Sequence, residues 1–262
     1  MKGISIAKID EGLVNEDSGI AKEELIAVSD GAGGGGVFAD LWSKYLVEHL
    51  PEEPICDFES FDKWIDSIWE LFYNNSEVLA KLEGGMLLNK FYDEGSFATL
   101  VAVWKSGQWI SYGDSVAFCY NKLTKVMNYS FTKLVDFNNP PYLVNCKDPL
   151  NKQGFNSGTF EIDENCIVFA TSDALSHYIL MMYEVANKDK YLDELQEAIN
   201  AQTKNSNFIK SALGIKRIDF EKDVLGKLLS ASKNKGNFGR HLRSLKKSGL
   251  LAHDDYTFVI MD

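Results

Sequence analysis

The sequence predicts an α+β fold in which strands and helices come in separate blocks. Runs rich in β-branched and aromatic residues, divided by short polar turns, fill residues 97–121, as in an antiparallel meander. Apolar residues at helical spacing dominate the segments before and after that region. Because strict βαβ alternation is absent, the sheets should be mostly antiparallel. No linker-like stretch interrupts the blocks, so we expect residues 1–262 to form a single domain.

Two strand-like runs precede the first expected helix. Residues 4–9 (ISIAKI) alternate small or apolar residues with polar ones, which is typical of a strand with one buried face. Residues 24–30 (ELIAVSD) form a short apolar run that stops at Asp30. We expect the residues between these two strands to form a loop.

Helical periodicity then replaces the strand pattern. Apolar residues from Val37 to Leu46 form a stripe at i, i+4 spacing and predict an amphipathic helix that ends before Pro51. Residues 58–72 step by three and four and predict a second helix that reaches toward Leu82. The later expected strands are residues 97–104, 108–114, 116–121, 166–171 and 256–262. The later expected helices are residues 178–202 and about 221–248.

Composition excludes several classes of protein. With 45% hydrophobic and 12% aromatic residues, the chain is a packed globule rather than a disordered one. A formal net charge of -11 argues against nucleic acid as the main partner. The four cysteines show no CxxC pair and indicate reduced core thiols, which favours a cytoplasmic location. No signal peptide and no apolar run of membrane-spanning length is visible, so we expect no membrane partner.

Acidic residues stand at strand ends or in turns at five places along the chain. They are Glu16 and Asp17 in NED, Asp30 in SDG, Asp114 in YGDS, Asp173 in TSDAL and Asp254 in HDDY. Carboxylates and backbone carbonyls are the oxygen ligands that Mg²⁺ and Mn²⁺ prefer. An aspartate at a strand end is equally typical of a turn or a helix cap. Spacing alone leaves both interpretations open.

Taken in order, these motifs resemble those of the metal-dependent serine/threonine protein phosphatases of the 2C (PPM) family, of bacterial type. The order is NED, SDG with a glycine run, GSFATLVAV, YGDS, IVFATSDAL and DDYTFVIMD, and it extends from Asn15 to the C-terminus. The resemblance implies a four-layer α-β-β-α sandwich with two mostly antiparallel sheets flanked by helices. It also implies hydrolysis of phosphoserine or phosphothreonine in a protein substrate by a hydroxide that bridges two Mn²⁺ or Mg²⁺ ions.

The resemblance also assigns roles to individual residues of this chain. No side chain acts as the nucleophile, because the attacking group is a metal-activated water. The implied metal ligands are Asp30, the carbonyl of Gly31, Asp173 and Asp254. Near the second ion, or around a third one, it places Glu16, Asp17 and Asp114. Their places beside Asp254 and Asp173, and not the resemblance, make His253 and His177 candidate neighbours of the phosphate or proton donors, with an ordinary surface position as the alternative for each.

The five glycines between Gly31 and Gly36 are expected to serve this metal site. A phosphate-binding P-loop would carry Lys and Ser or Thr after its last glycine, but Val37 and Phe38 follow here. The pattern instead predicts a tight turn from strand to helix. Its glycines let backbone segments approach closely, so that Asp30 can face metal ions.

Five positions depart from the family pattern, among them Val116 in place of an arginine after YGDS and Asp255 in place of an asparagine after Asp254. Gly12 stands where many relatives carry an arginine that binds the substrate phosphate, and Ala32 stands where some carry a histidine. Ala174 replaces a glycine and requires a backbone with negative φ. A Lys- and Arg-rich segment, residues 205–249, contrasts with the acidic whole. These features support an alternative function, a catalytically weak or inactive module that binds a protein partner.

Overall fold

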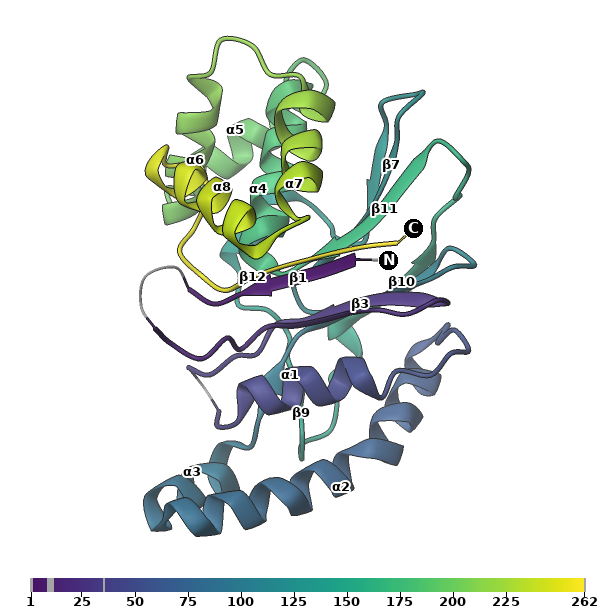
Figure 1. The fold of residues 1–262 in the computed structure, drawn as a ribbon, viewed down its shortest axis with the longest axis vertical. Helices are drawn as coiled ribbons and strands as arrows, with labels where there is room; N and C mark the ends of the chain where they lie inside the picture. The colour runs from purple at the N-terminus through teal and green to yellow at the C-terminus, as the bar shows by residue number, and fades with distance from the viewer. Residues whose placement is uncertain (1, 9–11, 35, 262) are drawn as a thin grey trace.

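The computed structural model describes residues 2–8, 12–34 and 36–261 of the chain. Ile9, Gly35 and Asp262, which belong to predicted elements, lie outside the described residues. The elements form four layers, with helices below and above two stacked sheets (Figure 1). The predicted α-β-β-α sandwich is therefore confirmed. Within the described residues, no helix is both long and apolar enough to cross a membrane.

Two five-stranded sheets form the middle of the sandwich, and all their strand pairs are antiparallel. The first sheet has the order β1 (Lys2–Ile6), β12 (Tyr256–Ile260), β11 (Cys166–Thr171), β7 (Val116–Asn121) and β8 (Met127–Tyr129). The second has the order β10 (Phe155–Thr159), β6 (Gln108–Tyr112), β5 (Leu100–Trp104), β3 (Leu25–Ser29) and β2 (Ser18–Ala21). A small separate pair joins β4 (Phe97–Ala98) to β9 (Val144–Asn145).

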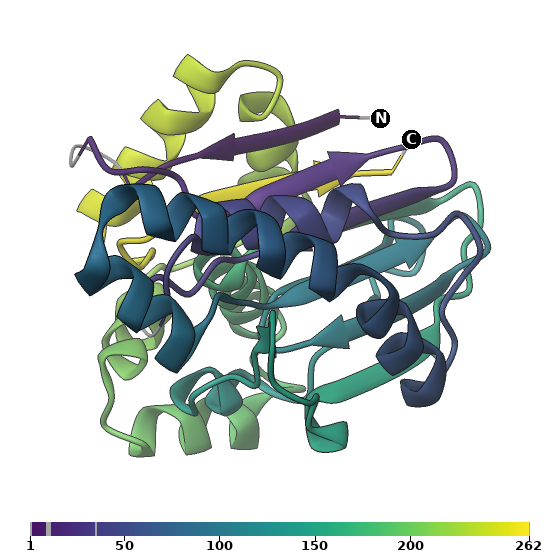
Figure 2. The same cartoon turned by 90° about the horizontal axis from the view of Figure 1, so that it is seen from below.

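Each sheet is covered on its outer face by helices. The second sheet carries α1 (Ala39–Glu48), α2 (Phe58–Glu83) and α3 (Gly85–Glu94), and Figure 2 shows this layer from below. The first sheet carries α4 (Asp173–Ala186), α5 (Leu192–Asn200), α6 (Lys204–Leu213), α7 (Gly226–Ala231) and α8 (Lys235–Lys247) (Figure 1). A π-helical turn, Phe220–Leu225, leads into α7.

Strand alternation explains why the sheets bury both faces. In β5, Val101 and Val103 pack toward the other sheet, whereas Leu100 and Trp104 pack against the lower helices. Both sets are fully buried, so the strand appears in the sequence as a continuous apolar run. The small side chains between the sheets let the two sheets approach each other closely, which fixes the strand ends relative to one another.

Several features of the fold differ from the sequence expectations, among them the expected helix 221–248, which is divided between α7 and α8. Strand β2 lies in the segment expected to be a loop, because its four residues SGIA carry no alternation to signal a strand. The expected strand 97–104 is interrupted at Thr99, whose backbone and side chain bind Asp30 instead. The expected helix 178–202 is divided by a turn between α4 and α5.

Candidate metal centre

The acidic motifs meet at one edge of the sandwich because neighbouring strands are antiparallel. Asp17 precedes β2 and Asp30 follows β3, and the register pairs Ser18 with Ser29. In the other sheet, Thr171 at the end of β11 pairs with Val116 in β7 and with Phe258 in β12. Asp114, Asp173 and Asp254 each lie within four residues of these paired positions. The structure therefore brings together the carboxylates that the sequence pattern indicated.

Backbone contacts hold Asp30 and Gly31 in place. The Asp30 N–H donates to the Thr99 hydroxyl at 3.1 Å, and the Thr99 N–H donates to the Asp30 carbonyl at 2.8 Å. Gly31 forms an isolated antiparallel bridge with Ala98, and its N–H donates to the Glu16 carbonyl at 3.2 Å. In an extended residue the N–H and C=O point the same way, so the Gly31 carbonyl also faces the Glu16 side.

The glycine run serves close approach, as the sequence predicts. A Cβ on Gly31 would lie 2.6 Å from the Glu16 carbonyl oxygen and 2.7 Å from that of Ala39. A Cβ on Gly33 would lie 1.8 Å from Oε1 of Glu16. Gly34, in contrast, has nothing within 4 Å of such an atom. The loop is therefore packed against the Glu16 segment at two of its glycines.

Burial and mutual repulsion shift the pKa values of the clustered carboxyl groups upward. Burial and the charges of Asp173 and Asp255 raise the pKa of Asp17 to about 8. Burial and the charges of Asp114 and Asp254 raise the pKa of Asp173 to about 8. The pKa of Asp30 is raised well above its usual value by burial and by four neighbouring aspartates. Without a cation the cluster thus disfavours full ionisation.

Asp17 shows most clearly that a cation fits this place. It is 5% exposed, and neither of its carboxylate oxygens has a hydrogen-bond partner of good geometry. Such a buried carboxyl group is costly to ionise, and a nearby cation would offset that cost. The described residues contain no group of three or more His, Cys, Asp or Glu side chains already arranged to hold a metal ion. The donor types and the unpartnered oxygens fit a divalent ion, although the side chains do not converge as a finished site.

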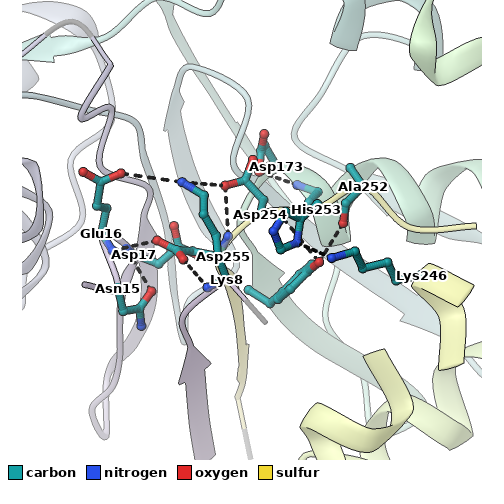
Figure 3. A network of polar contacts seen from close by, with 12 residues as sticks. Lys8, Asn15, Glu16, Asp17, Asp173, Lys246, Ala252, His253, Asp254 and Asp255 are labelled. Carbon is teal, nitrogen blue, oxygen red and sulfur yellow. Dashed lines mark hydrogen bonds and ion pairs between the residues drawn. The ribbon is translucent and has the colours of Figure 1, made fainter. Parts of the chain in front are cut away.

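Lys8 is a residue of this site that the sequence reasoning missed. Its Nζ lies 3.5 Å from Oδ1 of Asp254 and 3.8 Å from Oε2 of Glu16 (Figure 3). Burial opposes its charged form, but the charges of Asp254, Asp255 and Glu16 prevail and raise its pKa. Its position in the sequence does not match that of the family's arginine, because Lys8 lies eight residues before Glu16.

Asp255 holds Lys8 and Glu16 side by side, which explains why an acid stands here where the family pattern has an asparagine. It is 3% exposed, and its two oxygens accept the backbone N–H of Lys8 at 2.6 Å and that of Glu16 at 2.7 Å. An asparagine has one acceptor oxygen and could satisfy only one of these amides. Ala174 causes no strain, because it lies in the first turn of α4 and is absent from the residues with positive φ.

The two expected histidines occupy different surroundings. His177 is 5% exposed, its ring packs edge-on against Phe137 and Phe208, and burial lowers its pKa to about 4. It is therefore a neutral core residue, contrary to the expectation of a proton donor beside the phosphate. His253 precedes Asp254, and its Nδ1 lies 2.7 Å from Nζ of Lys246 on α8 (Figure 3). His253 thus lies next to Asp254 in the chain and contacts Lys246, and its role beside a phosphate stays a prediction.

Comparison with solved structures places this geometry among known folds. The serine/threonine phosphatase Stp1 from Staphylococcus aureus aligns with a TM-score of 0.51 and 13% identity over 98% of this chain and 93% of that one. The phosphatase PstP/Ppp from Mycobacterium tuberculosis aligns with a TM-score of 0.52 and 15% identity over 98% and 95%. This chain has the fold of the PPM phosphatases. Neither family models nor curated protein sequences match it.

The PPM fold agrees with the resemblance that the motifs carry. A catalytic domain of PstP in complex with two manganese ions aligns at a TM-score of 0.50 and 15% identity, over 99% of this chain and 97% of that one. Such coverage shows that the PPM fold extends through the chain, including the helical segment rich in Lys and Arg. At this level of identity, the similarity establishes the architecture, and the chemistry has to be argued from the residues.

Proposed function

We propose that the chain is a phosphoprotein phosphatase that hydrolyses phosphoserine or phosphothreonine with the help of Mn²⁺ or Mg²⁺. One observation carries the proposal: carboxylates from separate segments meet at one edge of a PPM fold, and Asp17 there is buried without a hydrogen bond of good geometry at either oxygen. A divalent cation would supply the positive charge that this cluster lacks. We further propose that residues 1–262 act as one domain in the cytoplasm.

The residues that would hold two ions are Asp30, the carbonyl of Gly31, Asp173 and Asp254. Glu16, Asp17 and Asp114 would support the second ion or a third. When bound, such ions lower the pKa of a water nucleophile and stabilise charge on the phosphoryl oxygens. The chain's own contribution is to fix the ligands: Thr99 holds the Asp30 backbone, and the Gly31 turn is pressed against the Glu16 segment. The PstP structure with two manganese ions supports this metal count.

The test compares hydrolysis of p-nitrophenyl phosphate and of a phosphothreonine peptide with and without Mn²⁺. We expect metal-dependent turnover that Asp30→Asn and Asp254→Asn each abolish. Asp66→Asn is the matched control, because Asp66 lies exposed on α2 and its loss should leave the rate unchanged. An inactive wild-type protein in the presence of Mn²⁺, or an active Asp30→Asn variant, would refute the proposal.

A second candidate is a catalytically weak or inactive module that keeps the PPM fold and binds a protein partner. The specific observation in its favour is the Lys8 ammonium, which contacts Glu16 and Asp254 at the proposed site. Ala32 and Gly12, where relatives carry functional side chains, point the same way. A calorimetric titration without Mn²⁺ binding at millimolar concentration, together with no hydrolysis, would favour this candidate.

A further inference from the structure

Lys8 contacts the cluster as part of a fixed arrangement rather than as a free surface lysine. Its backbone N–H is held by the buried carboxylate of Asp255 at 2.6 Å. The same carboxylate accepts the Glu16 N–H, so the backbones of Lys8 and Glu16 are held side by side by Asp255. The Lys8 side chain is 27% exposed, and it extends from there to the carboxylates of Glu16 and Asp254 (Figure 3).

The two carboxylates that Lys8 contacts are ones that a divalent ion would also use. Asp254 is a proposed ligand, and Glu16 lies beside the Gly31 and Gly33 turn. A pair between partly exposed charges contributes little stability by itself. Here, however, the ammonium faces Asp254, Asp255 and Glu16 together, so removing it would leave these charges to repel one another.

We infer that Lys8 is a built-in cation that competes with a divalent metal ion for Asp254 and Glu16. The inference rests on the proposed metal site. An ammonium beside a divalent ion is repelled by it, so binding of the ion requires Lys8 to withdraw from Asp254. The Lys8 ammonium thereby offsets part of the negative charge on Asp254 and Glu16, and the affinity for the ion is lower than the carboxylates alone would give.

The inference predicts that removing the Lys8 charge increases the affinity of the protein for metal. Removing a positive charge next to this site should strengthen metal binding, because the competing cation and its repulsion are both lost. We expect Lys8→Met and Lys8→Gln to lower the Kd for Mn²⁺ at least about tenfold. Lys8→Arg keeps the charge and should leave the Kd within about threefold of the wild type.

The experiment is isothermal titration of the full chain with MnCl₂, without a phosphoester, so that the readout is binding and not turnover. Lys22→Met is the matched control. Lys22 follows the far end of β2, and its Nζ donates to the Glu48 carbonyl at 3.1 Å. Lys22→Met removes one positive charge as Lys8→Met does, but away from Asp254 and Glu16, so its Kd for Mn²⁺ should match that of the wild type. Circular dichroism melting checks that each variant is folded, and Lys8→Gln serves if Lys8→Met is not.

The outcomes separate this inference from the proposed phosphatase function. Tighter binding by both neutral Lys8 variants, with Lys22→Met unchanged, supports the inference. Binding by the Lys8 variants alone, with none by the wild type, supports it in its strongest form. Equal affinity in all proteins overturns the inference and leaves the phosphatase proposal standing, as does weaker binding by the Lys8 variants. Absence of binding in every protein overturns both.

Discussion

Glu184 on α4, the helix that begins with Asp173, makes a sharp prediction about stability. Its side chain is 1% exposed, and its Oε2 has no hydrogen-bond partner. Burial and the charge of Glu194 raise its pKa from 4.5 to about 8. The folded state therefore holds a proton that the unfolded state releases above its ordinary pKa. Stability is lost as the pH rises from about 4.5 toward 8.

Glu184→Gln removes this dependence while it keeps the size of the side chain. Each pKa unit corresponds to about 1.4 kcal/mol. From the raised pKa, the advantage of the variant over the wild type should grow by about 2 kcal/mol between roughly pH 6 and pH 8.5. The pH dependence of this difference in the free energy of unfolding reports on Glu184 alone, because the other titrating groups are common to both proteins.

The assay is urea unfolding of metal-free wild type and variant at the two pH values, with the free energy of unfolding from linear extrapolation. Glu197→Gln, on the exposed side of α5, is the control. Its free energy of unfolding relative to the wild type should not change between the two pH values. Only its exposed ion pair with Lys133 is lost, and such a pair contributes little stability. A difference between wild type and Glu184→Gln that stays constant with pH would refute the reasoning, because it would mean that Glu184 titrates normally.

Three further predictions concern the carboxylate edge. Gly31→Ala should destabilise the fold by about 1–3 kcal/mol, because its Cβ would meet backbone oxygens at 2.6 and 2.7 Å. Gly34→Ala has open space around its Cβ and should stay within about 0.5 kcal/mol of the wild type. Urea unfolding of both variants measures the two effects. Asp17→Asn should raise the Kd for Mn²⁺ at pH 8.5 about tenfold, measured by calorimetry. An unchanged Kd would show that Asp17 does not contribute to metal binding. Asp255→Asn should leave one of the two loop amides that it binds without an acceptor, so that hydrogen exchange of that amide becomes at least about tenfold faster; unchanged protection of both would contradict this role.

Local patterns predicted mostly antiparallel strands with acidic residues at their ends, whereas the four layers and the proposed ligand set were implied by the resemblance to the PPM family. Apolar runs and turns mark β5, β6 and β7, and antiparallel pairing then brings acids at strand ends to one edge. Strand β2 was not predicted, since pairing with β3 rather than its own composition makes SGIA extended. Its existence is a consequence of the sheet.

The long-range contacts of the site could not be predicted from spacing. Lys8 and Asp255 are separated by 247 positions, and only the pairing of β1 with β12 brings them together. His177 was expected near the phosphate because it follows Asp173 closely. The packing of Phe137 and Phe208 around its ring places it in the core instead. Aromatic packing from distant elements is invisible in a local motif.

The most direct test of the central claim is the anomalous scattering of manganese in crystals of this protein grown with Mn²⁺. The account predicts strong anomalous peaks beside Asp30, with Asp173 and Asp254 around them and the Gly31 carbonyl directed at one of them. A map without a peak at this edge, or with peaks bound only by other residues, would contradict the claim that these carboxylates form a metal centre.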